Sequence, residues 1–164
     1  MTRNRVVLTP SSSFFALARE ALYSEGGEGR EVAFTPGGIS MLPTLRDRRD
    51  TVYLVKPTGA IKKYDVALFR RETGEYVLHR VVKVCRDGTY VFRGDFQTEL
   101  ERNVRREQIL AVMTAFQRGK RRIDCGRSVL YKVYSRVWTS ARPVLKLWRA
   151  CRLGLRRFAA RRAK

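Results

Sequence analysis

The stretch DVALFRRETGEYVLHRVVKV, residues 65–84, has the pattern of two β-strands joined by a tight turn. β-Branched and aromatic residues recur with a period of two in both halves, and the "ETGE" between them has the composition of a hairpin turn. Similar runs extend outward from Glu31 to about Cys125, namely "REVAF", "DTVYLV", "TYVFRG" and "ILAVMTAFQ". These strands are too short and too mixed for a parallel α/β sheet, so the sequence predicts a mainly β fold.

Two helical segments flank this β-rich region. "SSSFFALAREALY", residues 11–23, places serines as N-caps before apolar residues at helical spacing, and the glycine-rich "SEGGEGR" follows as a linker. We therefore expect an N-terminal helix and linker in residues 1–30 and a β-rich domain in residues 31–125. A basic, amphipathic helical tail is expected in residues 126–164.

The predicted tail separates apolar residues from cations. Pro143 should kink the helix or split it in two. At 100° per residue, the cations Lys132, Arg136, Arg142, Lys146 and Arg149 lie outside a single apolar arc. That arc holds Leu130, Val133, Tyr134, Val137, Trp138, Ala141, Val144, Leu145 and Trp148.

The formal net charge of +20 favours partners with dense negative charge, such as nucleic acid or an anionic membrane. The excess of positive charge is concentrated after Arg118, where Asp124 is the only acid. The basicity therefore belongs to the tail, and the β-rich region is nearly balanced.

Cysteine and histidine usage excludes several kinds of site. Cys85, Cys125 and Cys151 are far apart and lack Cys-x-x-Cys spacing, so neither a disulfide framework nor a cysteine-rich metal site is indicated. His79 is the only histidine, which excludes a histidine-cluster metal site, and we expect no cofactor. Without a signal-peptide pattern or a long uncharged apolar run, we expect a cytoplasmic protein, with peripheral contact to the inner face of the membrane left open.

A candidate nucleophile lies in "GGISMLPTL", residues 37–45. Gly37 and Gly38 allow close backbone approach, Met41 can anchor the loop, and Pro43 fixes the turn after Ser40. By itself this pattern is explained equally well by a turn hydroxyl that binds backbone.

Four boxes in order resemble those of the type I signal peptidases and the LexA-type self-cleaving repressors, which share a β-rich serine-peptidase fold. "GGISMLPTL" is similar to the nucleophile box Gly-x-Ser-Met-x-Pro-Thr-Leu, and "YDVALFR" to the Gly-Asp-Val/Ile-Val strand. "HRVVKV" resembles the Lys-Arg-Val-Val box that carries the lysine base, and "RGD", residues 93–95, resembles the Gly-Asp box. The resemblance covers about residues 34–117 and implies a signal peptidase/LexA-like β-fold.

At the base position His79 replaces lysine, as in the endoplasmic-reticulum type of signal peptidase. The resemblance therefore implies that Ser40 attacks the scissile carbonyl and His79, with an unperturbed pKa of about 6.5, takes its proton. Asp95 is the candidate that orients His79, and Glu99 and Glu101 fall where endoplasmic-reticulum-type members carry a further acid. The structural alternative for His79 is a half-buried strand histidine that is hydrogen-bonded to a backbone carbonyl. For Asp95 it is a Gly-Asp turn residue that bonds its own backbone.

The oxyanion hole is a second departure from the family pattern. Many signal peptidases have a serine at the position of Gly38, and its hydroxyl helps to hold the developing negative charge. The repressor branch has a glycine there, as this sequence does. The Ser40 backbone N–H is then expected to carry most of that task, with slow turnover as a consequence.

The sequence therefore predicts a serine endopeptidase of the signal-peptidase type that cleaves a peptide or protein precursor. The alternative is a non-catalytic, repressor-like β-domain that binds membrane or nucleic acid through its tail. For the tail, three interpretations remain: an interfacial helix on anionic lipid, with Trp138, Trp148 and Tyr134 in the headgroup region; a helix packed on the β-domain or on a second copy; and, less favoured, a nucleic-acid binder.

Overall fold

The computed structural model describes residues 7–8, 12–24 and 30–141. Residues 25–29 of the predicted linker, which spans residues 24–30, lie outside this part of the chain, and so do the positions Pro143, Val144, Leu145 and Trp148 of the predicted tail.

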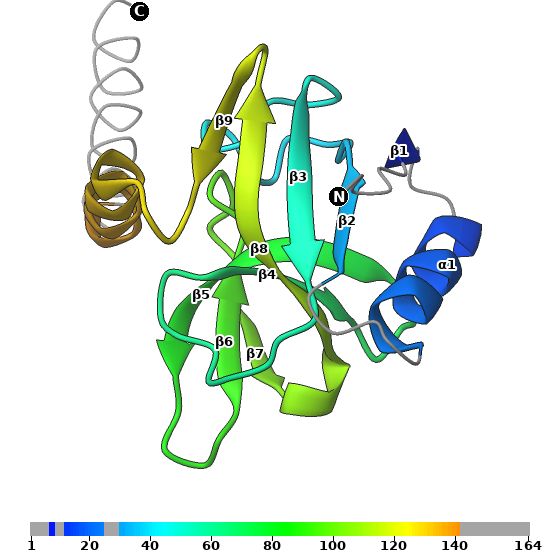
Figure 1. The fold of residues 1–164 in the computed structure, drawn as a ribbon. Coiled ribbons are helices and arrows are strands. Elements are labelled where there is room, and N and C mark those ends of the chain that lie inside the picture. Colours follow the sequence, from blue (N-terminus) through cyan, green and yellow to red (C-terminus); the bar gives the residue numbers. More distant parts are fainter. Residues whose placement is uncertain (1–6, 9–11, 25–29, 142–164) are drawn as a thin grey trace, which may run out of the picture.

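The described chain is mainly β, as the sequence predicts (Figure 1). One helix, α1 (Ser12–Tyr23), precedes the central strands, and a second helix covers residues 129–141. A single 3-10 turn, η1 (Arg106–Gln108), lies between β7 and β8. The strands are β1 (Val7–Leu8), β2 (Glu31–Phe34), β3 (Asp50–Val55), β4 (Val66–Arg70), β5 (Tyr76–Val84), β6 (Tyr90–Arg93), β7 (Glu101–Val104), β8 (Ile109–Arg118) and β9 (Arg121–Asp124).

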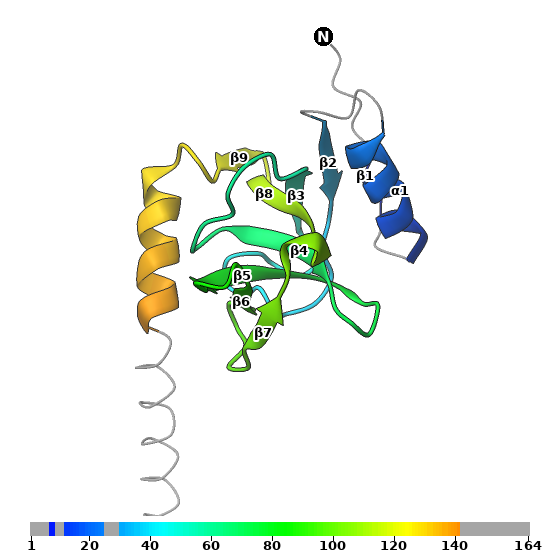
Figure 2. The same ribbon diagram turned by 90° about the horizontal axis from the view of Figure 1, so that it is seen from below.

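These strands form one sheet in the order β1-β2-β3-β8-β4-β5-β6-β7, and β9 pairs with β8. All pairs are antiparallel except β1 with β2. The expected hairpin at residues 65–84 is present, with Ala67 opposite His79 and Arg70 opposite Tyr76. Figures 1 and 2 show β4 and β5 crossing the direction of β2, β3 and β8, so the sheet is strongly curled.

The curled sheet has two large apolar clusters and a small third one of Ala33, Tyr53 and Ala115, because successive side chains of a strand point to opposite faces. In one large cluster Leu68 and Leu78 pack with Met41 and with Ala18 and Leu22 of α1. The other large cluster contains aromatic and aliphatic residues of β4 to β8, including Phe69, Val81 and Phe92. Strand β5 contributes to both large clusters, which places neighbouring residues of "HRVVKV" in different surroundings.

The two helices lie at opposite sides of the β-structure, as Figures 1 and 2 both show. Helix α1 covers the side of β2, whereas the helix at residues 129–141 follows β9. This arrangement leaves the turn after β2 and the segment after β6 between them, and both carry predicted site residues.

Candidate active site

Ser40 lies in the turn between β2 and β3, where its residue is partly exposed. Its carbonyl accepts a hydrogen bond from the Phe96 N–H at an N to O distance of 2.8 Å. A Cβ at Gly94 would lie 2.7 Å from the same carbonyl oxygen, so this close approach requires glycine. Met41 is buried beneath the turn. The candidate nucleophile is thus fixed to the segment that links β6 and β7.

Gly38 has a φ of +103°, a conformation that residues with a side chain rarely adopt. Its N–H donates a hydrogen bond to Asp47 Oδ1 at 2.7 Å. A serine at this position would be strained, which gives a local reason for the glycine. Within the described residues the Ser40 N–H donates to no backbone or side-chain acceptor.

The turn is also held from its far end. Arg118 on β8 donates from Nη2 to the carbonyl oxygens of Pro43 and Thr44, at 3.3 and 2.9 Å. The same guanidinium contacts the fully buried carboxylate of Asp50 at 3.0 Å. The turn is therefore braced on both the β6–β7 segment and β8.

A pocket of about 270 Å³ borders Ser40. Its walls are mostly apolar and include Phe15 of α1, Phe34 of β2, and Tyr76 and Leu78 of β5. Phe15 stacks on Tyr76 at a centroid distance of 4.5 Å, which closes the pocket toward α1. The volume suits small apolar groups better than an extended polar ligand.

His79 lies in the middle of β5, and its side chain is 1% exposed. Its ring faces Phe69, and Nδ1 lies 2.7 Å from Oε1 of Glu101 on β7. Nδ1 has no hydrogen bond of regular geometry, so this contact is a close approach between the ring and the carboxylate with poor alignment. Arg71 binds both oxygens of Glu101, at 2.8 and 2.9 Å, and holds the carboxylate in place.

The surroundings shift the pKa values of His79 and Glu101. Burial lowers the pKa of His79 below its ordinary value of 6.5, and the neighbouring Glu101 carboxylate opposes only part of this effect. Burial raises the pKa of Glu101, but the hydrogen bonds and positive charge of Arg71, together with the contact to His79, outweigh it, so the net pKa is lowered. At neutral pH the pair is therefore a neutral imidazole beside an ionised carboxylate.

Asp95 does not occupy the position predicted for it. Both its oxygens bind Arg80: Nε donates to Oδ1 at 2.8 Å, and Nη2 donates to Oδ2 at 2.6 Å. The Thr44 hydroxyl donates to Oδ2 as well. The carboxylate in contact with His79 Nδ1 is Glu101, and Asp95 acts on the pKa of His79 only as a more distant charge. Glu99 is exposed after the turn.

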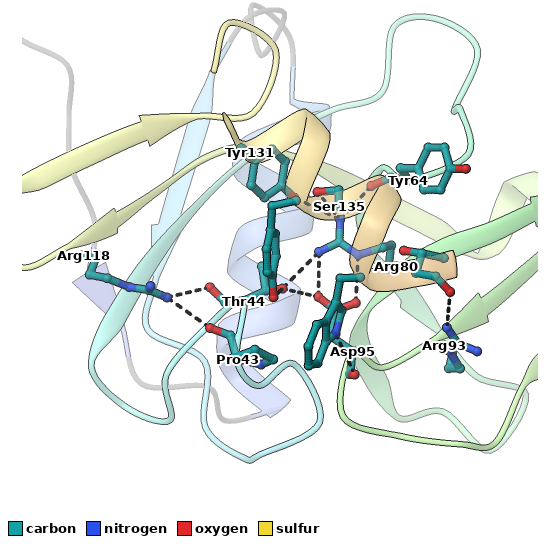
Figure 3. Close-up of polar contacts among 12 residues, drawn as sticks. Pro43, Thr44, Tyr64, Arg80, Arg93, Asp95, Arg118, Tyr131 and Ser135 are labelled. Atoms are coloured by element: carbon teal, nitrogen blue, oxygen red, sulfur yellow. Dashed lines mark hydrogen bonds and ion pairs between the residues drawn. The ribbon is translucent and has the colours of Figure 1, made fainter. Parts of the chain in front are cut away.

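Arg80 is the centre of a buried polar network that the sequence analysis did not single out (Figure 3). It is 0% exposed, and besides Asp95 it donates from Nη1 to the Tyr64 carbonyl at 2.9 Å. Further donations reach Thr44 of the Ser40 turn, Tyr131 and Ser135, at 3.2, 3.2 and 3.1 Å. The sequence does contain a signal for this network: Arg80 lies within an apolar strand, and a charge that is buried there must be paired.

The helix at residues 129–141 completes this network. Trp138 Nε1 donates to the Asp95 carbonyl at 3.1 Å, and the Tyr134 hydroxyl lies 3.0 Å from Thr44 Oγ1. Tyr131 is buried against Phe116. The expectation that Tyr134 and Trp138 enter lipid is therefore wrong, since both pack on the β-structure beside the Ser40 turn.

The structure thus holds two half-sites, one on the segment after β6 and the other on the first residue of β7. Gly94 to Phe96 hold the Ser40 turn, and Glu101 contacts His79. In the described chain no hydrogen bond joins the Ser40 hydroxyl to the His79 ring. No group of three His, Cys, Asp or Glu side chains within the described residues is placed to hold a metal ion.

In comparisons with known proteins, no family model matches this chain, and no curated protein sequence matches it. Across residues 12–24 and 30–141, no helix is both long enough and apolar enough to cross a bilayer.

Proposed function

We propose that the chain is a serine endopeptidase of the signal peptidase/LexA-like β-fold, which cleaves a peptide or protein precursor. The observation that carries the proposal is the buried His79 ring with the Glu101 carboxylate 2.7 Å from Nδ1. A carboxylate at one ring nitrogen leaves the other to exchange a proton and stabilises the imidazolium that forms. Ser40, His79 and Glu101 are the proposed triad, with Glu101 in the role that the sequence analysis gave to Asp95.

In the proposed reaction the Ser40 hydroxyl attacks the scissile carbonyl carbon, and His79 Nε2 takes its proton. The tetrahedral intermediate collapses when His79 returns that proton to the leaving amine, and an ester to Ser40 remains. Water, deprotonated by His79, then cleaves the ester and restores the serine. His79 does not line the pocket beside Ser40, so the reaction requires that substrate binding bring its Nε2 to the Ser40 hydroxyl.

Two further features support a peptide substrate. Within the described residues the Ser40 N–H has no acceptor and can donate to the oxyanion, and a single donor of this kind predicts slow turnover. The pocket of about 270 Å³ beside Ser40 is lined by Phe34, Met41 and Leu78, among other apolar groups, and accepts a small apolar side chain before the scissile bond.

A fluorophosphonate probe tests the nucleophile, because it forms a stable bond only with an activated serine. We expect the wild type to be labelled and Ser40→Ala to be unlabelled. Ser140→Ala is the matched control, since Ser140 is exposed on the helix at residues 129–141 and outside the site. If Ser40→Ala is labelled as strongly as the wild type, the proposal is wrong, and a non-catalytic β-domain explains the chain better.

A further inference from the structure

The helix at residues 129–141 presents an apolar strip to solvent. Four large aliphatic side chains are strongly exposed: Val129 by 71%, Leu130 by 78%, Val133 by 50% and Val137 by 61%. At 100° per residue they fall within an arc of about 100°, so they form one continuous strip. Burying such a strip is favourable, and within the described residues nothing covers it.

The strip cannot turn inward, because the opposite face of the same helix is already bound. Trp138 and Tyr134 are hydrogen-bonded to Asp95 and Thr44, and Ser135 and Tyr131 accept from Arg80. Rotating the helix to bury the valines would break these buried contacts and leave Arg80 poorly paired. The exposed face is thus a stable property of the fold.

Cations border the strip. Lys132 and Arg136 are exposed on the next arc of the helix, and Arg127 is exposed just before it. The sequence has no Asp or Glu after Asp124, while Lys and Arg continue to the last residue, Lys164. The surface therefore combines apolar contact with a positive field that no acid of the helix offsets.

This combination selects among partners. A second copy would bring the same cations together, which disfavours self-association through this face. Nucleic acid would bind the cations but leave the aliphatic strip in water, and the aromatic rings that could stack on bases face inward. An anionic lipid surface satisfies both features, because aliphatic side chains enter the interface while cations meet the headgroups.

We propose that the outer face of this helix, formed by Val129, Leu130, Val133 and Val137 with the flanking cations, binds the surface of an anionic bilayer. The helix lies in the plane of the interface, and the β-structure is attached to its inner face through the contacts of Trp138, Tyr134 and the Arg80 network. The site differs from an ordinary amphipathic anchor, since its aromatic residues hold the domain and its valines contact the lipid.

Co-sedimentation of the full chain with vesicles tests the proposal, using phosphatidylcholine alone and about three parts phosphatidylcholine to one part phosphatidylglycerol. We expect binding to the anionic vesicles only. Changing Val133→Ser and Val137→Ser together should weaken it about tenfold or more, since two aliphatic groups leave the interface. Lys132→Gln with Arg136→Gln should weaken it as well, and more so at low salt.

The matched control is Val84→Ser, because Val84 is 44% exposed at the end of β5, outside the strip. This variant should bind as the wild type does, and thermal melts should show that every variant is folded. If the variant with Val133→Ser and Val137→Ser binds anionic vesicles as tightly as the wild type does, the proposal is overturned, since binding would then be electrostatic alone. Valine-dependent dimerisation in light scattering, without lipid binding, overturns it in favour of an interface between copies.

Discussion

At the residue scale, the imidazole of His79 depends on one carboxylate. Glu101 lies 2.7 Å from Nδ1 in an otherwise apolar part of the sheet, and Arg71 keeps that carboxylate ionised and oriented. The pair resembles the base and orienting acid of hydrolytic triads in its chemistry, since a fixed negative group beside a buried imidazole stabilises the imidazolium when it forms. Glu101 is therefore the residue where the proposed activity is most sensitive to a small change.

Changing Glu101→Gln keeps the shape of the side chain and removes its charge. We expect fluorophosphonate labelling of Ser40 to slow by about 10³- to 10⁴-fold, because the imidazolium loses its partner. Glu99→Gln is the control, as Glu99 is exposed, and it should label at the wild-type rate. Equal rates in the two variants would remove Glu101 from the proposed triad.

The pH dependence of labelling follows from the lowered pKa of His79. Only the neutral ring accepts the serine proton, so the rate should rise with pH through a midpoint below 6.5, because burial lowers the pKa of His79. In Glu101→Gln that midpoint should move to still lower pH, since the carboxylate raises the pKa of His79. A midpoint well above 6.5 would contradict His79 as the base.

Gly94 provides a second test at this scale. In Gly94→Ala the new Cβ would lie 2.7 Å from the Ser40 carbonyl and 2.8 Å from Gln97 Oε1, and the backbone contact cannot yield cheaply. We expect labelling to fall at least tenfold, since small displacements of a nucleophile are costly. Gly59→Ala is the matched control, because its Cβ would meet no atom within 4 Å. A Gly94→Ala protein that labels normally would mean that this contact does not position Ser40.

At the scale of elements, β5 joins the two halves of the site. Its alternation sends His79 toward Phe69 and Glu101, and Arg80 toward Asp95 and the helix at residues 129–141. One strand therefore orients the proposed base and ties the Ser40 turn to the C-terminal helix through Thr44.

We expect Arg80→Met to lower the free energy of unfolding by about 3–5 kcal/mol, because the buried Asp95 carboxylate loses the cation that pairs with it. Arg122→Met is the control: its ion pair with Glu31 is partly exposed, and its loss should cost less than about 1 kcal/mol. Urea unfolding of the two variants measures the difference. Similar losses would show that the buried pair contributes no more than a surface pair.

At the scale of the whole molecule, acid should destabilise the fold through its buried carboxylates. The pKa of Asp50 is lowered by hydrogen bonds from Arg46 and Arg118 that outweigh its burial, and the pKa of Glu101 is lowered as well. Groups with a depressed folded pKa stabilise fully above the unfolded values of 3.8 and 4.5, and this stabilisation is lost as pH falls through the folded pKa.

The melting temperature should therefore drop steeply below pH of about 4. In Asp50→Asn this drop should be shallower, although the variant is less stable at neutral pH, because Arg46 and Arg118 lose their buried partner. Asp124→Asn is the control, since Asp124 is exposed on β9. A melting temperature that is flat between neutral pH and pH of about 3 would contradict this account.

Local sequence patterns were enough to predict the mainly β fold and the glycine-containing turn that carries Ser40. Period-two runs and hairpin turns predict β-strands because they depend on local geometry, and the hairpin at residues 65–84 has the predicted partners. Glycine at position 38 is also a local requirement, set by its φ of +103°. The box resemblance pointed to Ser40 and His79, whose joint role stays a prediction.

Which acid lies beside His79 and which beside Arg80 depends on contacts between strands that are distant in sequence. Asp95 and Glu101 have similar chemistry and lie six residues apart, but the pairing of β6 with β7 brings Glu101 to His79 and leaves Asp95 to Arg80. The helical pattern of the tail likewise predicts a single apolar arc but does not say which part of it faces the β-structure. In the structure the hydrogen bonds of Trp138 and Tyr134 place these two residues on the inward face. Long-range contacts made both choices, because burial and charge pairing depend on neighbours distant in sequence.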